Sequence, residues 1–78
     1  MLAPALEHLV KGIVDHPDEV QVAAKSSPRG EVLEVLVHPE DLGRVIGRAG
    51  RTAKALRTLV TALADGRKVR VDIVATDE

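Results

Sequence analysis

The chain has 78 residues, 45% of them apolar, which is enough for one small globular domain. It has no cysteine, which excludes a disulfide scaffold, a thiolate metal site and a cysteine nucleophile. The net charge of −1 conceals a segregation, because residues 1–42 carry −5, residues 43–70 carry +7 and residues 71–78 carry −3. Such a basic block is compatible both with a phosphate-binding face and with two solvated surfaces of opposite charge.

Apolar residues at helical spacing predict a first helix over residues 3–15, which ends before Pro17. Alternating residues then predict a half-buried strand over residues 20–25. A more apolar run over residues 31–37 predicts a second, more central strand. The short loop over residues 26–30 makes these two strands an antiparallel hairpin.

Two helices are expected next. Pro39, followed by two acidic residues, is typical of a helix start, and this helix ends at Gly47 after about two turns. A longer helix begins after Gly50 and ends near Gly66. Its expected inner face consists of Ala53, Leu56, Leu59, Val60 and Leu63.

Clean alternation over residues 68–74 predicts a third strand, and residues 75–78 are expected to form a polar tail. The resulting order, αββααβ, predicts an α+β domain. Its two-helix crossover is long enough to make the second and third strands parallel. No apolar run approaches the roughly 20 residues of a membrane span, and the start lacks the basic region of a signal peptide. We therefore expect a single cytoplasmic domain over residues 1–78.

The segment over residues 43–52 combines three glycines with three arginines. A Walker A loop needs lysine where Arg51 stands and glycine where Val45 stands, and the dinucleotide pattern GxGxxG also fails at Val45. What remains is GxxG at residues 47–50, between two helices. A turn with glycine at both ends lets a ligand backbone approach closely, and the following helix directs its N-terminal amides to the same place.

Basic side chains surround this turn. Arg44, Arg48, Arg51 and Lys54 can pair with phosphates. Arg51, Lys54 and Arg57 recur every three residues and therefore share one broad, outward helix face. The chain has no Phe, Tyr or Trp, so base stacking on aromatic side chains is excluded.

Residues 15–20, 39–57 and 69–74 together resemble a type II KH domain, and most closely the small stand-alone bacterial KH proteins of the KhpA family. The resemblance covers almost the whole chain. Ala49 departs from the family pattern, which often has a polar residue there. The resemblance implies one KH domain over residues 1–78, in which a three-stranded mixed sheet packs against three helices on one face.

The resemblance further implies a protein that binds single-stranded RNA, has no catalytic activity and needs no cofactor. It would act as a small RNA chaperone or post-transcriptional regulator. The RNA backbone would lie on the GxxG loop, and the bases would lie in an aliphatic groove between the second helix and the sheet edge near the second strand. The implied RNA-binding residues are Gly43, Arg44, Gly47, Arg48, Ala49, Gly50, Arg51, Lys54 and Arg57.

Partners also follow from the resemblance. Without aromatic stacking one domain would bind RNA weakly, and avidity in a homodimer, or in a heterodimer with a larger multi-domain KH protein, would raise the affinity. The alternative is a protein-interaction module that acts mainly as a dimer partner. No membrane and no small-molecule substrate are implied. Lys68 and Arg70, on the outer face of the third strand, either contact RNA or only solvate the strand.

Other polar residues have simpler explanations. His16 and His38 precede prolines and are interpreted as boundary residues. Glu40 and Asp41 point about 100° apart on a helix, so helix-dipole complementation explains them better than a carboxylate pair. Asp15, His16 and Asp18 form a polar group that is interpreted as the end of the first helix rather than as a metal site.

Overall fold

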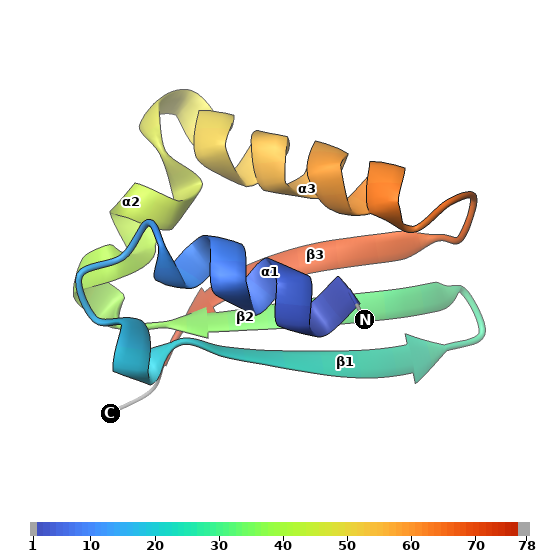
Figure 1. Cartoon of the computed structure of the whole chain (residues 1–78), viewed down its shortest axis with the longest axis horizontal. Helices are drawn as coiled ribbons and strands as arrows, with labels where there is room; N and C mark the ends of the chain where they lie inside the picture. Colours follow the sequence, from blue (N-terminus) through green and yellow to red (C-terminus); the bar gives the residue numbers. More distant parts are fainter. Residues whose placement is uncertain (1, 77–78) are drawn as a thin grey trace.

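The computed structural model describes residues 2–76, in which three helices cover one face of a three-stranded sheet (Figure 1). The strands are β1 (Gln21–Ser27), β2 (Gly30–Val37) and β3 (Val69–Ala75), and β2 lies in the centre. β1 pairs antiparallel with β2, and β3 pairs parallel with it. The predicted α+β class, the αββααβ order and the mixed sheet are confirmed.

Three α-helices and three single 3-10 turns complete the fold. The α-helices are α1 (Leu2–Lys11), α2 (Leu42–Ile46) and α3 (Arg51–Leu63). The 3-10 turns are Pro17–Glu19, Pro39–Asp41 and Arg48–Gly50. Within residues 2–76 no helix is both long enough and apolar enough to cross a membrane.

The first helix is shorter than predicted. The sequence pattern extends to residue 15, whereas α1 ends at Lys11. The N–H of Gly12 lies 3.3 Å from the carbonyl oxygen of His8 and 3.2 Å from that of Leu9, which tightens the last turn. The chain then leaves the helix, and Val14 still reaches the core from the connecting segment.

Other element boundaries also differ from the predictions. The expected loop over residues 26–30 is reduced to residues 28–29, because β1 continues to Ser27 and β2 begins at Gly30. Residues from Pro39 to Asp41 form a 3-10 turn, so α2 begins only at Leu42. At the C-terminal end, Ala75 belongs to β3, and the N–H of Thr76 donates to the carbonyl oxygen of Val37 at 2.7 Å. The predicted polar tail is therefore wrong for Ala75, which belongs to β3, while residues 77–78 lie outside the described chain.

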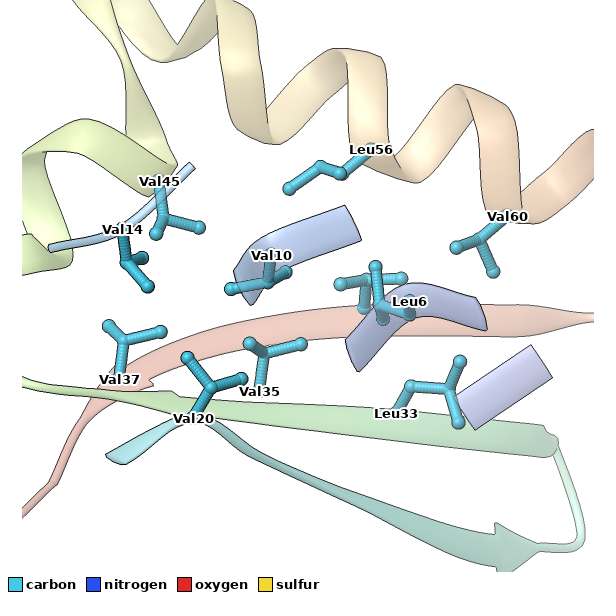
Figure 2. Close-up of a cluster of buried hydrophobic side chains, with 11 residues drawn as sticks. Leu6, Val10, Val14, Val20, Leu33, Val35, Val37, Val45, Leu56 and Val60 are labelled. Carbon is cyan, nitrogen blue, oxygen red and sulfur yellow. The ribbon is translucent and has the colours of Figure 1, made fainter. Parts of the chain in front are cut away.

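The core lies between β2 and the helices (Figure 2). Leu33, Val35 and Val37 alternate along β2 and are fully buried. The helices cover them with Leu6, Val10, Val45, Leu56 and Val60. Burial of each such side chain contributes about 1.5–3 kcal/mol, so this small aliphatic core is the main source of stability.

The inner face of α3 is narrower than predicted. Ala53, Leu56 and Val60 are buried, but Leu59 is 39% exposed and Leu63 is 52% exposed. The buried positions are spaced by three and four residues and define one narrow stripe, and the other two leucines fall on its flank. The prediction that Leu59 and Leu63 belong to the core is therefore wrong.

Candidate nucleic-acid interface

The turn between α2 and α3 has two residues in the left-handed region and one glycine in a still rarer conformation. Gly47 has φ 78° and ψ 171°, Ala49 has φ 56° and ψ 26°, and Gly50 has φ 76° and ψ 13°. A Cβ on Gly47 would lie 2.8 Å from both the Cβ and the backbone nitrogen of Thr52, whereas a Cβ on Gly50 would meet no atom within 4 Å. Gly47 is thus required for close packing and for its backbone conformation, and Gly50 only for its backbone conformation.

The N-terminus of α3 opens at this turn. The helix begins at Arg51, and the preceding residue, Gly50, provides no side-chain cap. The first-turn amides and the helix dipole therefore place partial positive charge beside the turn. Arg48, Arg51 and Lys54 are exposed around it, and Ala49 is exposed within the turn itself.

Two of the predicted basic residues have partners within the protein. Nη2 of Arg44 lies 3.3 Å from Oδ2 of Asp15, in an exposed ion pair. Nε of Arg57 donates to the carbonyl oxygen of Val71 in β3 at 3.2 Å. Gly43 lies in α2, where an added Cβ would meet no atom within 4 Å. The predicted residues therefore extend from α2 through the turn to the middle of α3, and their side chains lie in different environments.

β3 forms the edge of the sheet that lies below α3. Because β2 is central, the edges of the sheet are β1 and β3, and α3 runs above β3 (Figure 1). The bond from Arg57 to Val71 joins α3 directly to this edge. β2 itself is not an edge strand, because the parallel crossover places β3 on its outer side. The position of the expected groove stays a prediction.

The end of α2 provides apolar surface beside the turn. The sequence pattern assigns Val45 and Ile46 to the same stripe. In the structure Val45 is completely buried, whereas Ile46 is 38% exposed and directly precedes Gly47. An exposed aliphatic side chain next to a turn with exposed backbone and arginines is suited to contact a base if RNA binds there.

A buried carboxylate holds α2 in place, and the sequence reading did not detect it. Asp41 is 1% exposed and accepts hydrogen bonds from the backbone N–H groups of Asp15 (3.2 Å) and His16 (2.9 Å). The ring Nδ1 of His16 lies 3.0 Å from Oδ2 of the same carboxylate. Asp41 is the N-cap residue of α2, so helix-dipole complementation describes only part of its role. Its main role is to tie the segment after α1 to the start of α2.

His16 and His38 do more than mark boundaries. Their rings stack with centroids 4.1 Å apart and an interplanar angle of 14°. Hydrogen bonding to Asp41 is the main cause of a raised pKa at His16, helped by the charges of Glu40 and Glu19. Burial alone would raise the pKa of Asp41, but the hydrogen bonds from Asp15 and His16 outweigh it and lower that pKa below its usual value.

These shifts predict a pH dependence of stability. A raised pKa at His16 stabilises the folded state fully below about pH 6.5, and this contribution is lost as pH rises through the folded-state pKa. A lowered pKa at Asp41 stabilises it above about pH 3.8, and this contribution is lost as pH falls through the folded-state pKa. We therefore expect the contribution of this pair to the melting temperature to be largest between about pH 4 and 6.5.

Thermal melts followed by circular dichroism from about pH 3 to 9 measure this dependence. The variant His16→Asn should lose the decline on the alkaline side, whereas His8→Asn, on the exposed surface of α1, should keep it. An unchanged alkaline decline in His16→Asn would show that another group causes it.

The same cluster is the one group of three potential metal ligands within residues 2–76: His16, His38 and Glu40, with ligand atoms within 4.8 Å of one another. Its geometry does not fit a metal ion. Nδ1 of His38 already accepts the N–H of Glu40 at 3.0 Å, and Nδ1 of His16 is bonded to Asp41. Because the rings are stacked, the lone pairs of their nitrogens lie in two nearly parallel planes and do not converge on one point. The cluster instead connects the segment after α1 to the start of α2.

The comparison with family models matches residues 4–74 to the KH domain of KhpA/KhpB. The chain belongs to the KhpA/KhpB family. It is 86% identical over 74 residues to the RNA-binding protein KhpA of Leifsonia xyli subsp. xyli, covering 95% of this chain and 97% of that one. It is 69% identical to the KhpA of Streptomyces coelicolor, covering 99% of this chain and 96% of that one. It is 59% identical to the KhpA of Mycobacterium tuberculosis, and the match covers 100% of this chain and 96% of that one. The predicted family is confirmed.

A more distant structural match agrees with the KhpA/KhpB assignment. The crystal structure of a single-residue variant of Aquifex aeolicus Era, bound to GDP and AlF4−, superimposes with a TM-score of 0.60 at 18% sequence identity. The match covers 95% of this chain and 29% of the Era chain. At this identity the likeness shows a shared fold. A KH domain is a binding module, and this KhpA/KhpB-family chain is not an enzyme.

Proposed function

We propose that this chain binds single-stranded RNA at the turn over residues 47–50, and that it acts in the cytoplasm as an RNA chaperone or post-transcriptional regulator. The conformation of the turn carries the proposal. Gly47 and Gly50 expose backbone without a Cβ beside an uncapped helix N-terminus and exposed arginines. The relatives named RNA-binding protein KhpA support the choice of RNA.

The residues around the turn have distinct roles in this proposal. Backbone at Gly47 and Gly50 approaches the phosphates, and Arg48 and Arg51 supply charge-assisted hydrogen bonds. Ile46 and the β3 edge contact the bases. Lys54 contacts the backbone farther along α3, while Arg57 contacts it only with the nitrogens that Val71 does not engage. Arg44 contributes when it leaves its exposed ion pair with Asp15, which costs about 1 kcal/mol or less.

Salt dependence tests this function. Binding of a labelled pool of short single-stranded RNAs is measured by fluorescence anisotropy at several salt concentrations. Each neutralised phosphate contributes about −0.7 to the slope of log affinity against log salt, so three or four contacts predict roughly −2 to −3. A slope near zero, or no binding at micromolar protein, would contradict the proposal.

A specific surface supports the alternative, a dimerisation module. Leu9 of α1 and Leu59 and Leu63 of α3 are 37%, 39% and 52% exposed. Leu9 and Leu59 line a cavity of about 400 Å³ between the two helices, together with Ile13. This apolar surface suits a second copy or a larger KH protein. An apparent molecular mass that rises with protein concentration, without salt-dependent RNA binding, would favour this alternative as the main function.

A further inference from the structure

A second basic surface lies at the opposite end of α3 from the turn over residues 47–50. There the β1–β2 hairpin and the loop from α3 to β3 meet (Figure 1). Residues of both segments line an open cavity of about 410 Å³. Four cations line it, Arg29, Arg67, Lys68 and Arg70, against one carboxylate, Glu31.

Direct contacts hold the two walls of this cavity together. The N–H of Glu31 donates to the carbonyl oxygen of Lys68 at 3.0 Å. Nη1 of Arg67 lies 3.2 Å from Oε1 of Glu31, and its Nε donates to the carbonyl oxygen of Ala64 at 3.3 Å. These contacts therefore fix the hairpin against the loop, although the two segments are more than 30 residues apart in the chain.

Two of the four cations are available to a ligand. Arg67 pairs with Glu31, and Arg70 pairs with Asp72 at 3.0 Å. Within residues 2–76 neither Arg29 nor Lys68 forms an ion pair, and both are exposed. The excess positive charge of the cavity therefore comes from one residue on each wall.

One flank of α3 connects the cavity to the turn. Lys54, Arg57 and Thr61 are spaced by three and four residues and so lie on the same side of the helix. The hydrogen bond from Arg57 to Val71 directs this side toward β3, and Thr61 lines the cavity. The 13 residues of α3 extend about 20 Å, so cations follow one another along this line from the turn to the cavity.

We propose that this cavity, called the distal site, binds the phosphodiester backbone of the RNA strand beyond the nucleotides held at the turn. The proposal rests on the proposed function. No lining residue is buried, so the site offers exposed, additive charge rather than the enclosed donors that select a free phosphate or a nucleotide. The distal site would therefore lengthen the bound RNA segment past the roughly four nucleotides that a GxxG loop clamps.

The test compares a four-nucleotide RNA with one of about twelve nucleotides. The variant Arg29→Ala/Lys68→Ala should bind the long RNA about tenfold more weakly, with a salt slope lower by about 1.4, and should bind the short RNA like the wild type. The matched control is Lys11→Ala/Lys25→Ala, which removes two exposed cations elsewhere and should leave both affinities unchanged. Circular dichroism verifies that each variant is folded.

The outcomes separate this proposal from the proposed function. Equal binding of both RNAs by wild type, or an unchanged long-RNA affinity in Arg29→Ala/Lys68→Ala, overturns the distal site and leaves the proposed function intact. Failure of wild type to bind either RNA overturns both. An NMR titration with inorganic phosphate distinguishes the sources of phosphate. Saturable shifts at Arg29 and Lys68 without RNA would assign the site to free phosphate and overturn its role in RNA binding.

Discussion

The double substitution Arg48→Asp/Ala49→Asp should weaken RNA binding by about 100-fold or more, a change of about 2.7 kcal/mol in binding free energy. It removes one arginine of the proposed RNA-binding turn and places two exposed carboxylates there, in the path of the RNA backbone in this proposal. Repulsion at such short range is strong because the RNA displaces the screening solvent. Anisotropy titrations against the same short RNAs measure the loss.

The fold should survive this change. Both side chains are exposed, so no core contact is lost. Ala49 has φ 56° and ψ 26°, a left-handed conformation that aspartate adopts more readily than most residues. Circular dichroism and thermal melts should therefore match the wild type within a few degrees.

A control with the same charge change isolates the effect of position. Lys25→Asp/Ser26→Asp alters the net charge equally on exposed residues of β1. Both variants are compared with the four-nucleotide RNA, which is too short to reach the distal site beside these residues. It should lower the affinity only slightly, through the overall charge. If the folded turn variant binds RNA as well as this control does, the RNA lies elsewhere and the proposed site is wrong.

Gly47→Ala should cost about 3 kcal/mol or more of folding free energy, the largest effect expected at any glycine of the turn. The new Cβ would lie 2.8 Å from the Cβ and the backbone nitrogen of Thr52. The backbone at φ 78° and ψ 171° is in addition unfavourable for any residue with a Cβ. In a domain of this size such a loss lowers the melting temperature by more than about 10 °C. Thermal and chemical denaturation measure it.

Two other glycines supply controls of the same chemistry. In Gly50→Ala the new Cβ meets open space. The folded state is destabilised only by the strain of a left-handed backbone with a side chain, about 1 kcal/mol. Gly43→Ala lies in α2 with open space, and should stabilise the protein by roughly 0.5–1 kcal/mol. The expected order of stability is Gly43→Ala, wild type, Gly50→Ala, Gly47→Ala. Equal losses at Gly47 and Gly50 would contradict the packing against Thr52.

Much of the fold could be predicted because its signals are local. The apolar run in residues 31–37 and the helical spacing in α3 depend on neighbours a few positions away. The GxxG turn and its arginines were recognisable for the same reason. The errors arise where local signals are ambiguous, as at the end of α1, where Val14 continues the apolar stripe although the helix ends at Lys11.

The sequence by itself determined the element order, the turn over residues 47–50 and the basic block, because propensity, periodicity and charge belong to single residues and their neighbours. Only the tertiary structure decided the role of Asp41, whose partner His16 is 25 residues away, and the position of β3 beside α3. It also decided which arginines are paired, and that Arg29 and Lys68 line one cavity. These features depend on which distant segments meet, and that is set by packing the whole chain around one core.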